Sequence, residues 1–314
     1  MQETDTPEFT DDNNAYGFGI SSPNSTGWNG GVSGNQIEEN FDPAVGFVNE
    51  TGIRSLSSEL GYRWRFGGDR MIRTIQFSTN ASRTELLETG LLDRQDSRVR
   101  VSVTTRNQDS IFLNFSSNKE NIPFNFPIYR PSNVFLDPSD PSYPSDYDPQ
   151  DPCASTVVVC ILRGSYSWDS VSLGMRTGEQ RKVSAFFSFT TGDYYDGESK
   201  NINSNISWRP SRKLSISGGY SLRDVDLPGG SFQVRQSDLS VSYAFSSTLS
   251  WVNLIQYDNF SEVIGFNSRL HWIPEAGREG FIVFNHNVRD RDKNDSFHSI
   301  DADVSVKFSY TLRY

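Results

Sequence analysis

The sequence has few of the residues on which several common protein classes depend. Its 314 residues include only two cysteines, three histidines and three methionines. No stretch approaches the roughly 20 consecutive apolar residues of a membrane-spanning helix. The net charge is −10, and no block of basic residues occurs. This charge balance argues against a nucleic-acid partner.

Aromatic residues, by contrast, are abundant. Hydrophobic residues make up 35% of the chain, and aromatic residues alone make up 13%, with 22 Phe, 13 Tyr and 6 Trp. This aromatic content argues against wholesale disorder. A low apolar fraction that is rich in aromatics fits a β-barrel with lipid outside and water inside.

Helical periodicity is nearly absent, and alternation with period two is widespread. The C-terminal residues show it best, because apolar side chains at every second position share one face of an extended strand. The apolar face comprises Val304, Val306, Phe308, Tyr310, Leu312 and Tyr314. The strand ends on an aromatic residue, and we interpret Phe308, Tyr310, Leu312 and Tyr314 as the terminal signal that the barrel-assembly machinery recognises.

The same alternation recurs upstream, and the polar positions are mostly Ser, Asn, Thr and Gly with isolated charges. Such a polar face suits a crowded, hydrated lumen better than an open protein surface. We predict fifteen strands, at 14–21, 25–37, 52–65, 71–82, 95–106, 109–118, 162–176, 181–192, 199–208, 213–223, 232–245, 248–258, 263–273, 280–288 and 302–314.

Connections between these strands alternate between short and mostly longer segments, as in outer-membrane barrels with short periplasmic turns and long extracellular loops. Longer connections are expected at 38–51, 83–94, 193–198, 224–231 and 289–301, with a long extracellular loop at 119–161. The prediction is therefore an all-β, antiparallel transmembrane barrel of about 14–16 strands that occupies residues 14–314.

The strand count predicts that something precedes the barrel. Bacterial single-chain barrels usually have an even number of strands, whereas fifteen are visible here. The opening Met1-Gln2-Glu3 carries neither the basic nor the apolar region of a secretory signal. We expect residues 1–13 to be a lead-in or the remnant of a preceding strand, and the chain to be truncated at its N-terminus.

Several turn and loop segments carry a family resemblance, at 41–48, 61–65, 192–197, 227–232, 255–257 and 269–279. They resemble an uncharacterised family of large outer-membrane proteins. Members join an N-terminal sandwich, similar to a family-9 carbohydrate-binding module, to a C-terminal barrel domain of unknown function. The resemblance covers the barrel part, from about Thr4 to Tyr314, and implies an association with carbohydrate. The sandwich is absent, so no sugar-binding residues carry over.

Two groups of residues on predicted loops are candidates for binding or for a covalent link. Carboxylates beside aromatics, as in Asp193, Tyr194, Tyr195, Asp196 and Glu198, can hold Ca²⁺ or stack on a sugar. The alternative is a solvated turn. Cys153 and Cys160 favour a small disulfide-closed loop, the alternative being two free thiols. No cofactor is predicted beyond possible Ca²⁺, and no other metal site, because neither a histidine nor a third cysteine lies near this pair.

Charged residues on the polar face of the strands are expected to face the lumen, where they either pair across strands or line a pore. His271 shares this face and is the centre of an alternative hypothesis, a membrane-embedded hydrolase with a His–Ser or His–Asp pair. No nucleophile-elbow or zinc-protease motif supports that hypothesis. The predicted lumen residues are Glu59, Arg63, Arg65, Arg100, His271, Lys307 and Arg313.

The sequence thus predicts a non-enzymatic protein of the bacterial outer membrane. Its function is expected to be a pore or transport conduit, or a membrane anchor at the cell surface, linked to carbohydrate or polymer handling. Expected partners are outer-membrane lipid, the barrel-assembly machinery, and an extracellular carbohydrate or partner domain. A soluble β-sandwich that binds carbohydrate is a further alternative, in which the apolar faces would turn inward.

Overall fold

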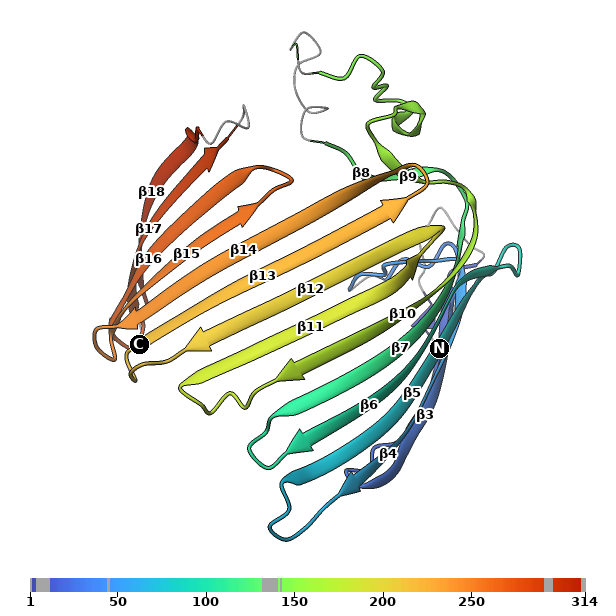
Figure 1. Cartoon of the computed structure of the whole chain (residues 1–314), viewed down its shortest axis with the longest axis horizontal. Helices are drawn as coiled ribbons and strands as arrows, with labels where there is room; N and C mark the ends of the chain where they lie inside the picture. Colours follow the sequence, from blue (N-terminus) through green and yellow to red (C-terminus); the bar gives the residue numbers. More distant parts are fainter. Residues whose placement is uncertain are drawn as a thin grey trace.

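The computed structural model describes residues 2–3, 12–43, 46–131, 141, 143–290 and 296–311. They form one large antiparallel sheet of sixteen strands that follow one another in chain order, and a two-stranded sheet inserted between β7 and β10. Figure 1 shows this arrangement. The predicted all-β, antiparallel fold is confirmed. Within the described segments, no helix is long and apolar enough to cross a membrane.

All fifteen predicted strands are present, and β1 is the additional one. Apart from β1, the strands of the large sheet are 9 to 15 residues long. They are β1 (Gln2–Glu3), β2 (Asn14–Ser22), β3 (Gly27–Ile37), β4 (Ile53–Arg65), β5 (Ile72–Leu86), β6 (Leu92–Thr105), β7 (Ser110–Ile122), β10 (Gly164–Arg176), β11 (Val183–Tyr194), β12 (Gly197–Trp208), β13 (Leu214–Leu227), β14 (Gly230–Ala244), β15 (Leu249–Asp258), β16 (Val263–Glu275), β17 (Arg278–Arg289) and β18 (His298–Tyr310).

The two ends of the sheet carry different connections, and we call them the short-turn end and the loop end. The short-turn end holds 23–26, 66–71, 106–109, 177–182, 209–213, 245–248 and 276–277. The loop end holds the long connections 38–52, 123–163 and 290–297, together with 87–91 and 259–262.

Two of the loops expected to be long are in fact two-residue turns, at 195–196 and 228–229. The expectation was wrong because β11 to β14 continue past the point where apolar residues stop alternating on one face. The long loop predicted at 119–161 instead spans 123–163. It contains β8 (Phe126–Tyr129), a short 3₁₀ helix, η2 (Pro152–Ala154), and β9 (Val159–Ile161).

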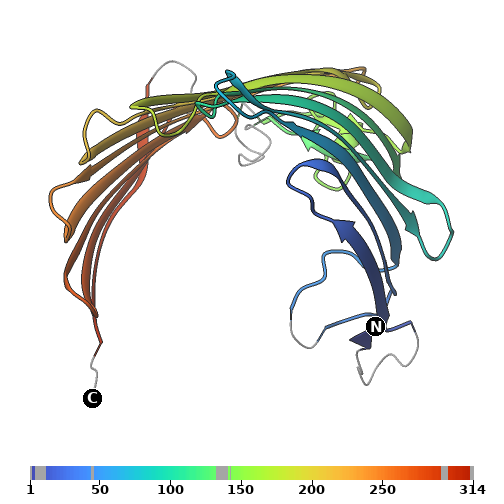
Figure 2. The ribbon, with the colours of Figure 1, turned by 90° about the horizontal axis from the view of Figure 1, so that it is seen from below.

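The large sheet is curved like an arch, so that it has a convex and a concave face (Figure 2). Within the described residues its first and last strands are not paired with each other. The β8–β9 hairpin lies under the arch in Figure 2, and its Val159 and Ile161 pack against Val225 and Leu227 of β13. The face of β13 that carries Val225 and Leu227 is therefore the concave one.

Strand alternation and the pairing register extend this assignment across the sheet. Positions that pair with Val225 or follow it at every second residue lie on the concave face, and they include many of the Ser, Asn and Gly positions of the strands. The convex face carries large apolar side chains that are exposed, among them Phe18, Leu60, Val101, Leu173, Ile206, Leu239, Ile255, Ile282 and Val306.

Candidate functional site

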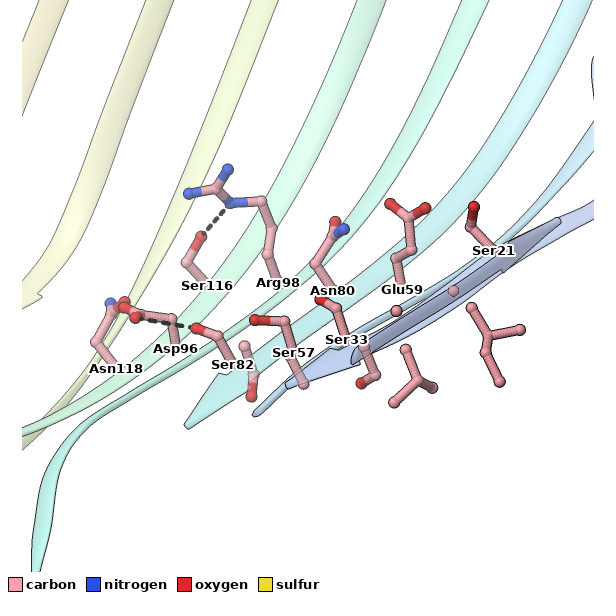
Figure 3. Close-up of a pocket in the computed structure, with 17 residues that line it drawn as sticks. Ser21, Ser33, Ser57, Glu59, Asn80, Ser82, Asp96, Arg98, Ser116 and Asn118 are labelled. Atoms are coloured by element: carbon pink, nitrogen blue, oxygen red, sulfur yellow. Dashed lines mark hydrogen bonds between the residues drawn. The ribbon is translucent and has the colours of Figure 1, made fainter. Parts of the chain in front are cut away.

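The concave face forms a polar cavity over β2 to β7, with a volume of about 630 Å³. Figure 3 shows its polar side chains arranged along the neighbouring strands. Most are small, and this leaves the space in front of the sheet open. The residues labelled there are Ser21, Ser33, Ser57, Glu59, Asn80, Ser82, Asp96, Arg98, Ser116 and Asn118.

Two hydrogen bonds link side chains across neighbouring strands of this cavity. The Ser82 hydroxyl donates to Asp96 over 3.4 Å, and Arg98 Nε donates to Ser116 Oγ over 3.4 Å. Glu59 lines the same cavity. The surface therefore offers hydroxyls, amides and both signs of charge to a polar solute, and no single charge dominates it.

Two of the predicted lumen arginines, Arg63 and Arg100, make polar or aromatic contacts within the sheet. Arg63 donates from Nε and Nη2 to Gln76 Oε1, over 3.1 and 2.8 Å. The Arg100 guanidinium lies 4.1 Å from the centre of the Phe112 ring, a cation–π contact. Alternation places Arg65 and Lys307 on the concave face, whereas Arg313 lies outside the described residues.

His271 lies near the short-turn end on the concave face. Its Nε2 is 3.4 Å from Glu279 Oε2, and its ring stacks on Phe281 with centroids 4.1 Å apart. On the convex face, His286 Nε2 is 3.1 Å from Ser299 Oγ. The described part of the chain thus holds a His–acid pair and a His–Ser pair in two places, and no histidine contacts both partners of a catalytic triad.

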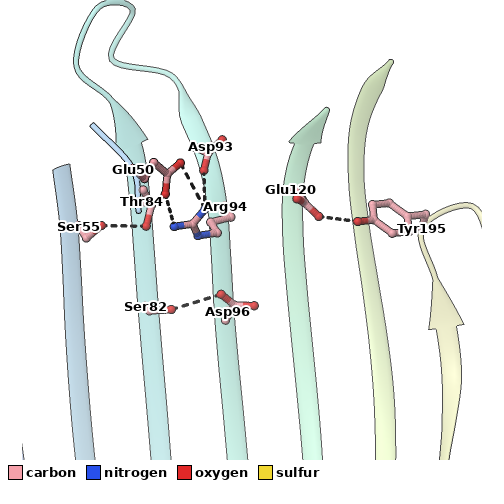
Figure 4. A network of polar contacts seen from close by, with 9 residues as sticks. All are labelled: Glu50, Ser55, Ser82, Thr84, Asp93, Arg94, Asp96, Glu120 and Tyr195. Atoms are coloured by element: carbon pink, nitrogen blue, oxygen red, sulfur yellow. Dashed lines mark hydrogen bonds and ion pairs between the residues drawn. The ribbon is translucent and has the colours of Figure 1, made fainter. Parts of the chain in front are cut away.

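Aromatic rings gather on the concave face at the loop end. Tyr195 donates its hydroxyl to Glu120 over 2.8 Å, as Figure 4 shows. Burial, followed by this contact with Glu120, raises the pKa of Tyr195 well above its ordinary value. Trp168 packs on Tyr195 at 4.5 Å, and Arg223 lies 4.9 Å above the Tyr194 ring.

The predicted Asp193–Glu198 cluster is divided between the two faces of the sheet. Tyr194 and Tyr195 point to the concave side, whereas Asp193 and Glu198 pair across β11 and β12 and are both exposed on the convex side. Among the described residues, no three His, Cys, Asp or Glu side chains converge as a metal site requires.

The predicted cysteine pair lies in the connection between β7 and β10. Cys153 and Cys160 form a disulfide with a Cα–Cα distance of 5.7 Å. Nearby, Asp146 accepts hydrogen bonds from the Thr156 backbone and hydroxyl over 2.8 and 2.7 Å, and these bonds lower the pKa of Asp146. The hairpin is fixed to the sheet by Tyr129, whose ring stacks on Phe232 at 4.7 Å.

The other long connection, 38–52, is tied to the strands by a second polar network at the loop end (Figure 4). Arg94 Nη2 donates to Glu50 over 2.6 Å, and its Nη1 lies 3.3 Å from Asp93. Burial raises the pKa of Asp93. Ser55 and Thr84 hydroxyls are 3.0 Å apart on the adjoining strands.

Sequence reasoning missed most of these loop-end residues, although a signal was present. On β13, the positions that carry Ser215, Ser217 and Arg223 continue into apolar Val225 and Leu227. This reversal of the alternation marks where the concave face stops facing water and packs against the β8–β9 hairpin. A comparable reversal is present beside Glu120 and Trp168, because the same faces of β7 and β10 carry Ile122 and Tyr166.

Comparisons with known proteins identify no family for this chain. No protein-family model matches it, and no curated protein matches it. The family resemblance drawn from its turn sequences therefore stays a prediction.

Solved structures of the ferric enterobactin receptor PfeA from Pseudomonas aeruginosa are similar in fold. A G324V mutant matches with a TM-score of 0.47 and 10% identity, over 87% of this chain and 50% of the receptor. A double mutant, R480A and Q482A, matches with a TM-score of 0.44 and 10% identity, over 94% and 56%. The chain thus spans about half the length of these receptors.

Proposed function

We propose that this chain is the wall of a bacterial outer-membrane β-barrel and that its concave face lines a conduit for polar solutes. The observation that carries the proposal is the separation of side chains between the two faces. Exposed apolar residues cover the convex face, and polar residues, many of them serines, line the concave cavity over β2 to β7. Lipid on one side and water on the other would account for both.

The convex face also has the layering expected across a bilayer. On β13 its apolar residues run from Leu214 to Leu222 and are followed by Asp224. A tilted strand of this length matches the apolar band of about 25 Å found in outer-membrane barrels. Exposed tryptophans mark the short-turn border of the band, where aromatic belts form. They are Trp28, Trp64, Trp208, Trp251 and Trp272.

Charged side chains take over on the convex face toward the loop end. This change supports a loop end that lies in water on one side of the membrane, and by the usual asymmetry of such barrels the long loops would be extracellular. The residues concerned are Arg54, Arg83, Lys119, Asp169, Lys200, Asp224 and Arg235.

Two adjacent serines on β4 provide the test. Both serines border the concave cavity. Alternation directs the Ser57 side chain into the cavity and the Ser58 side chain to the convex face. The protein is reconstituted in a planar bilayer, and each serine is replaced by cysteine; the native disulfide leaves no free thiol among the described cysteines. A bulky water-soluble thiol reagent should reduce the conductance of Ser57→Cys and leave Ser58→Cys unchanged. Equal responses, or a folded protein without conductance, would contradict the conduit.

A further inference from the structure

Basic side chains gather on the concave face beside the short-turn end, outside the cavity over β2 to β7. They lie within six strand residues of the short turns, where the pairing register puts them on one face. Among the described concave positions of these segments, Glu279 is the one carboxylate, and it lies 3.4 Å from His271. We call the basic side chains the basic zone; they are Arg63 and Arg65 on β4, Arg100 on β6, Arg176 on β10 and Lys307 on β18.

Farther from the short turns, the concave face carries both signs of charge. Glu59, Asp96 and Arg98 line the cavity together. On β18, Asp301 and Asp303 each accept hydrogen bonds from an asparagine of β17. The concave face is therefore mixed in charge over the cavity and toward the loop end, and basic beside the short turns.

The charge of the basic zone is not neutralised within the described sheet. Arg63 donates to the uncharged amide of Gln76, and Arg100 lies over the ring of Phe112. In the part of the chain that the structure describes, neither of them forms an ion pair, nor do Arg65 and Lys307. Arg176 has an exposed partner, Glu179 of the turn 177–182, at 3.8 Å. Because arginine and lysine stay protonated at neutral pH, this part of the wall is positively charged.

The arginines are close enough to act on one solute. β4 and β6 are two strand spacings apart, which is about 10 Å, a distance comparable with the Debye length at 0.1 M salt. The positions that connect them across the sheet carry Gly61 and Ser78, opposite Arg100. Because these residues are small, the guanidinium groups of Arg63 and Arg100 are not screened from a solute by a bulky side chain between them.

We propose that the basic zone makes the conduit selective for anionic solutes that carry carboxylate or phosphate groups. This inference rests on the proposed function. Arginine and lysine side chains that line a pore favour anions and oppose cations. The guanidinium fork also matches the paired oxygens of a carboxylate or a phosphate. A solute that enters at the loop end would meet the mixed charges of the cavity first and the basic zone after it.

The reversal potential in a planar bilayer under a KCl gradient tests the selectivity. The wild type should pass Cl⁻ several-fold better than K⁺. The triple variant Arg63→Gln, Arg65→Gln and Arg100→Gln should lose this preference, whereas lysine at the same three positions should retain it. Arg235→Gln is the matched control, because it removes an arginine from the convex face. Equal permeability of both ions in the wild type, or equal effects of the triple variant and the control, would overturn the proposal.

Anion binding to the folded protein in detergent provides a readout that needs no conductance. Calorimetric titration with citrate and with pyrophosphate should detect binding of at least one of them, and the tighter of the two identifies the preferred group. The triple glutamine variant should bind several-fold more weakly than the wild type and than Arg235→Gln. Absence of binding for both anions, or equal binding by all variants, would contradict the basic zone. A conducting protein without anion preference overturns this proposal alone, whereas a protein that binds either anion but does not conduct contradicts the conduit.

Discussion

The same strand behaves differently in its two halves. In β13, the residues from Leu214 to Leu222 alternate between the convex face, where they are mostly apolar, and the concave face, where they are small and polar. Beyond Arg223 the pattern inverts, so that the concave Val225 is fully buried and the convex Asp224 is charged. Within the apolar band, the proposed function puts lipid on the convex side of the sheet and water on the concave side, whereas at the loop end the concave face packs against the β8–β9 hairpin.

The difference shows that a barrel strand is stabilised by different interactions along its length. In the first half, the proposed function assigns lipid to the apolar face and water to the polar one. In the second half, the β8–β9 hairpin supplies the apolar partner, and Tyr129, Phe232 and the buried valine and isoleucine side chains form the contact. A substitution that one half of the strand tolerates should therefore destabilise the other half.

The largest effect is expected at the buried concave position. Val225→Asp would place a carboxylate where no water reaches, and we expect a loss on the order of 3–5 kcal/mol in the stability of the loop-end core. Ser217→Asp, on the same face of the same strand but in its polar half, should change stability little. Urea unfolding in detergent and protease cleavage of the 123–163 connection measure both, and equal losses in the two variants would refute the distinction.

The second test addresses the convex face. Its order is the opposite of that on the concave face, because it is apolar within the band and charged at the loop end. Leu173→Arg on β10 puts a charge in the apolar band and should cost about 2–4 kcal/mol. Asp169→Arg, four residues along on the same face, lies in the charged region and should be nearly neutral. The measurement is the folded fraction in phospholipid vesicles across a urea series. A similar cost at both positions would place the membrane boundary elsewhere.

The halves also differ in how far the sequence could predict them. Alternation predicted every strand from β2 to β18 of the large sheet, because the polarity of each residue indicates whether its position lies on the apolar or the polar face. Alternation failed at 193–198 and 224–231. There the strands continue, but apolar residues move to the concave face and charged residues to the convex face. The contact between Tyr195 and Glu120 joins residues 75 positions apart, and no local pattern encodes it. Asp193 and Glu198 look like a cluster in the sequence, yet alternation puts them on the convex face, whereas the tyrosines between them lie on the concave side.

The smallest expected effect concerns the hydroxyl of Tyr195. Tyr195→Phe removes the hydrogen bond to Glu120 and should cost about 1 kcal/mol of loop-end stability near neutral pH.

Because the folded state raises the pKa of Tyr195, the neutral phenol is the form that stabilises the fold. Its contribution is complete below the ordinary tyrosine pKa of about 10 and is lost as the pH rises above it. Protease cleavage of 123–163 should therefore accelerate above about pH 10 in the wild type and much less in Tyr195→Phe. Tyr220→Phe, on the convex face of β13, serves as the matched control and should respond to alkaline pH like the wild type. If cleavage of the Tyr195→Phe variant accelerates above pH 10 as much as that of the wild type, another group is responsible for the titration.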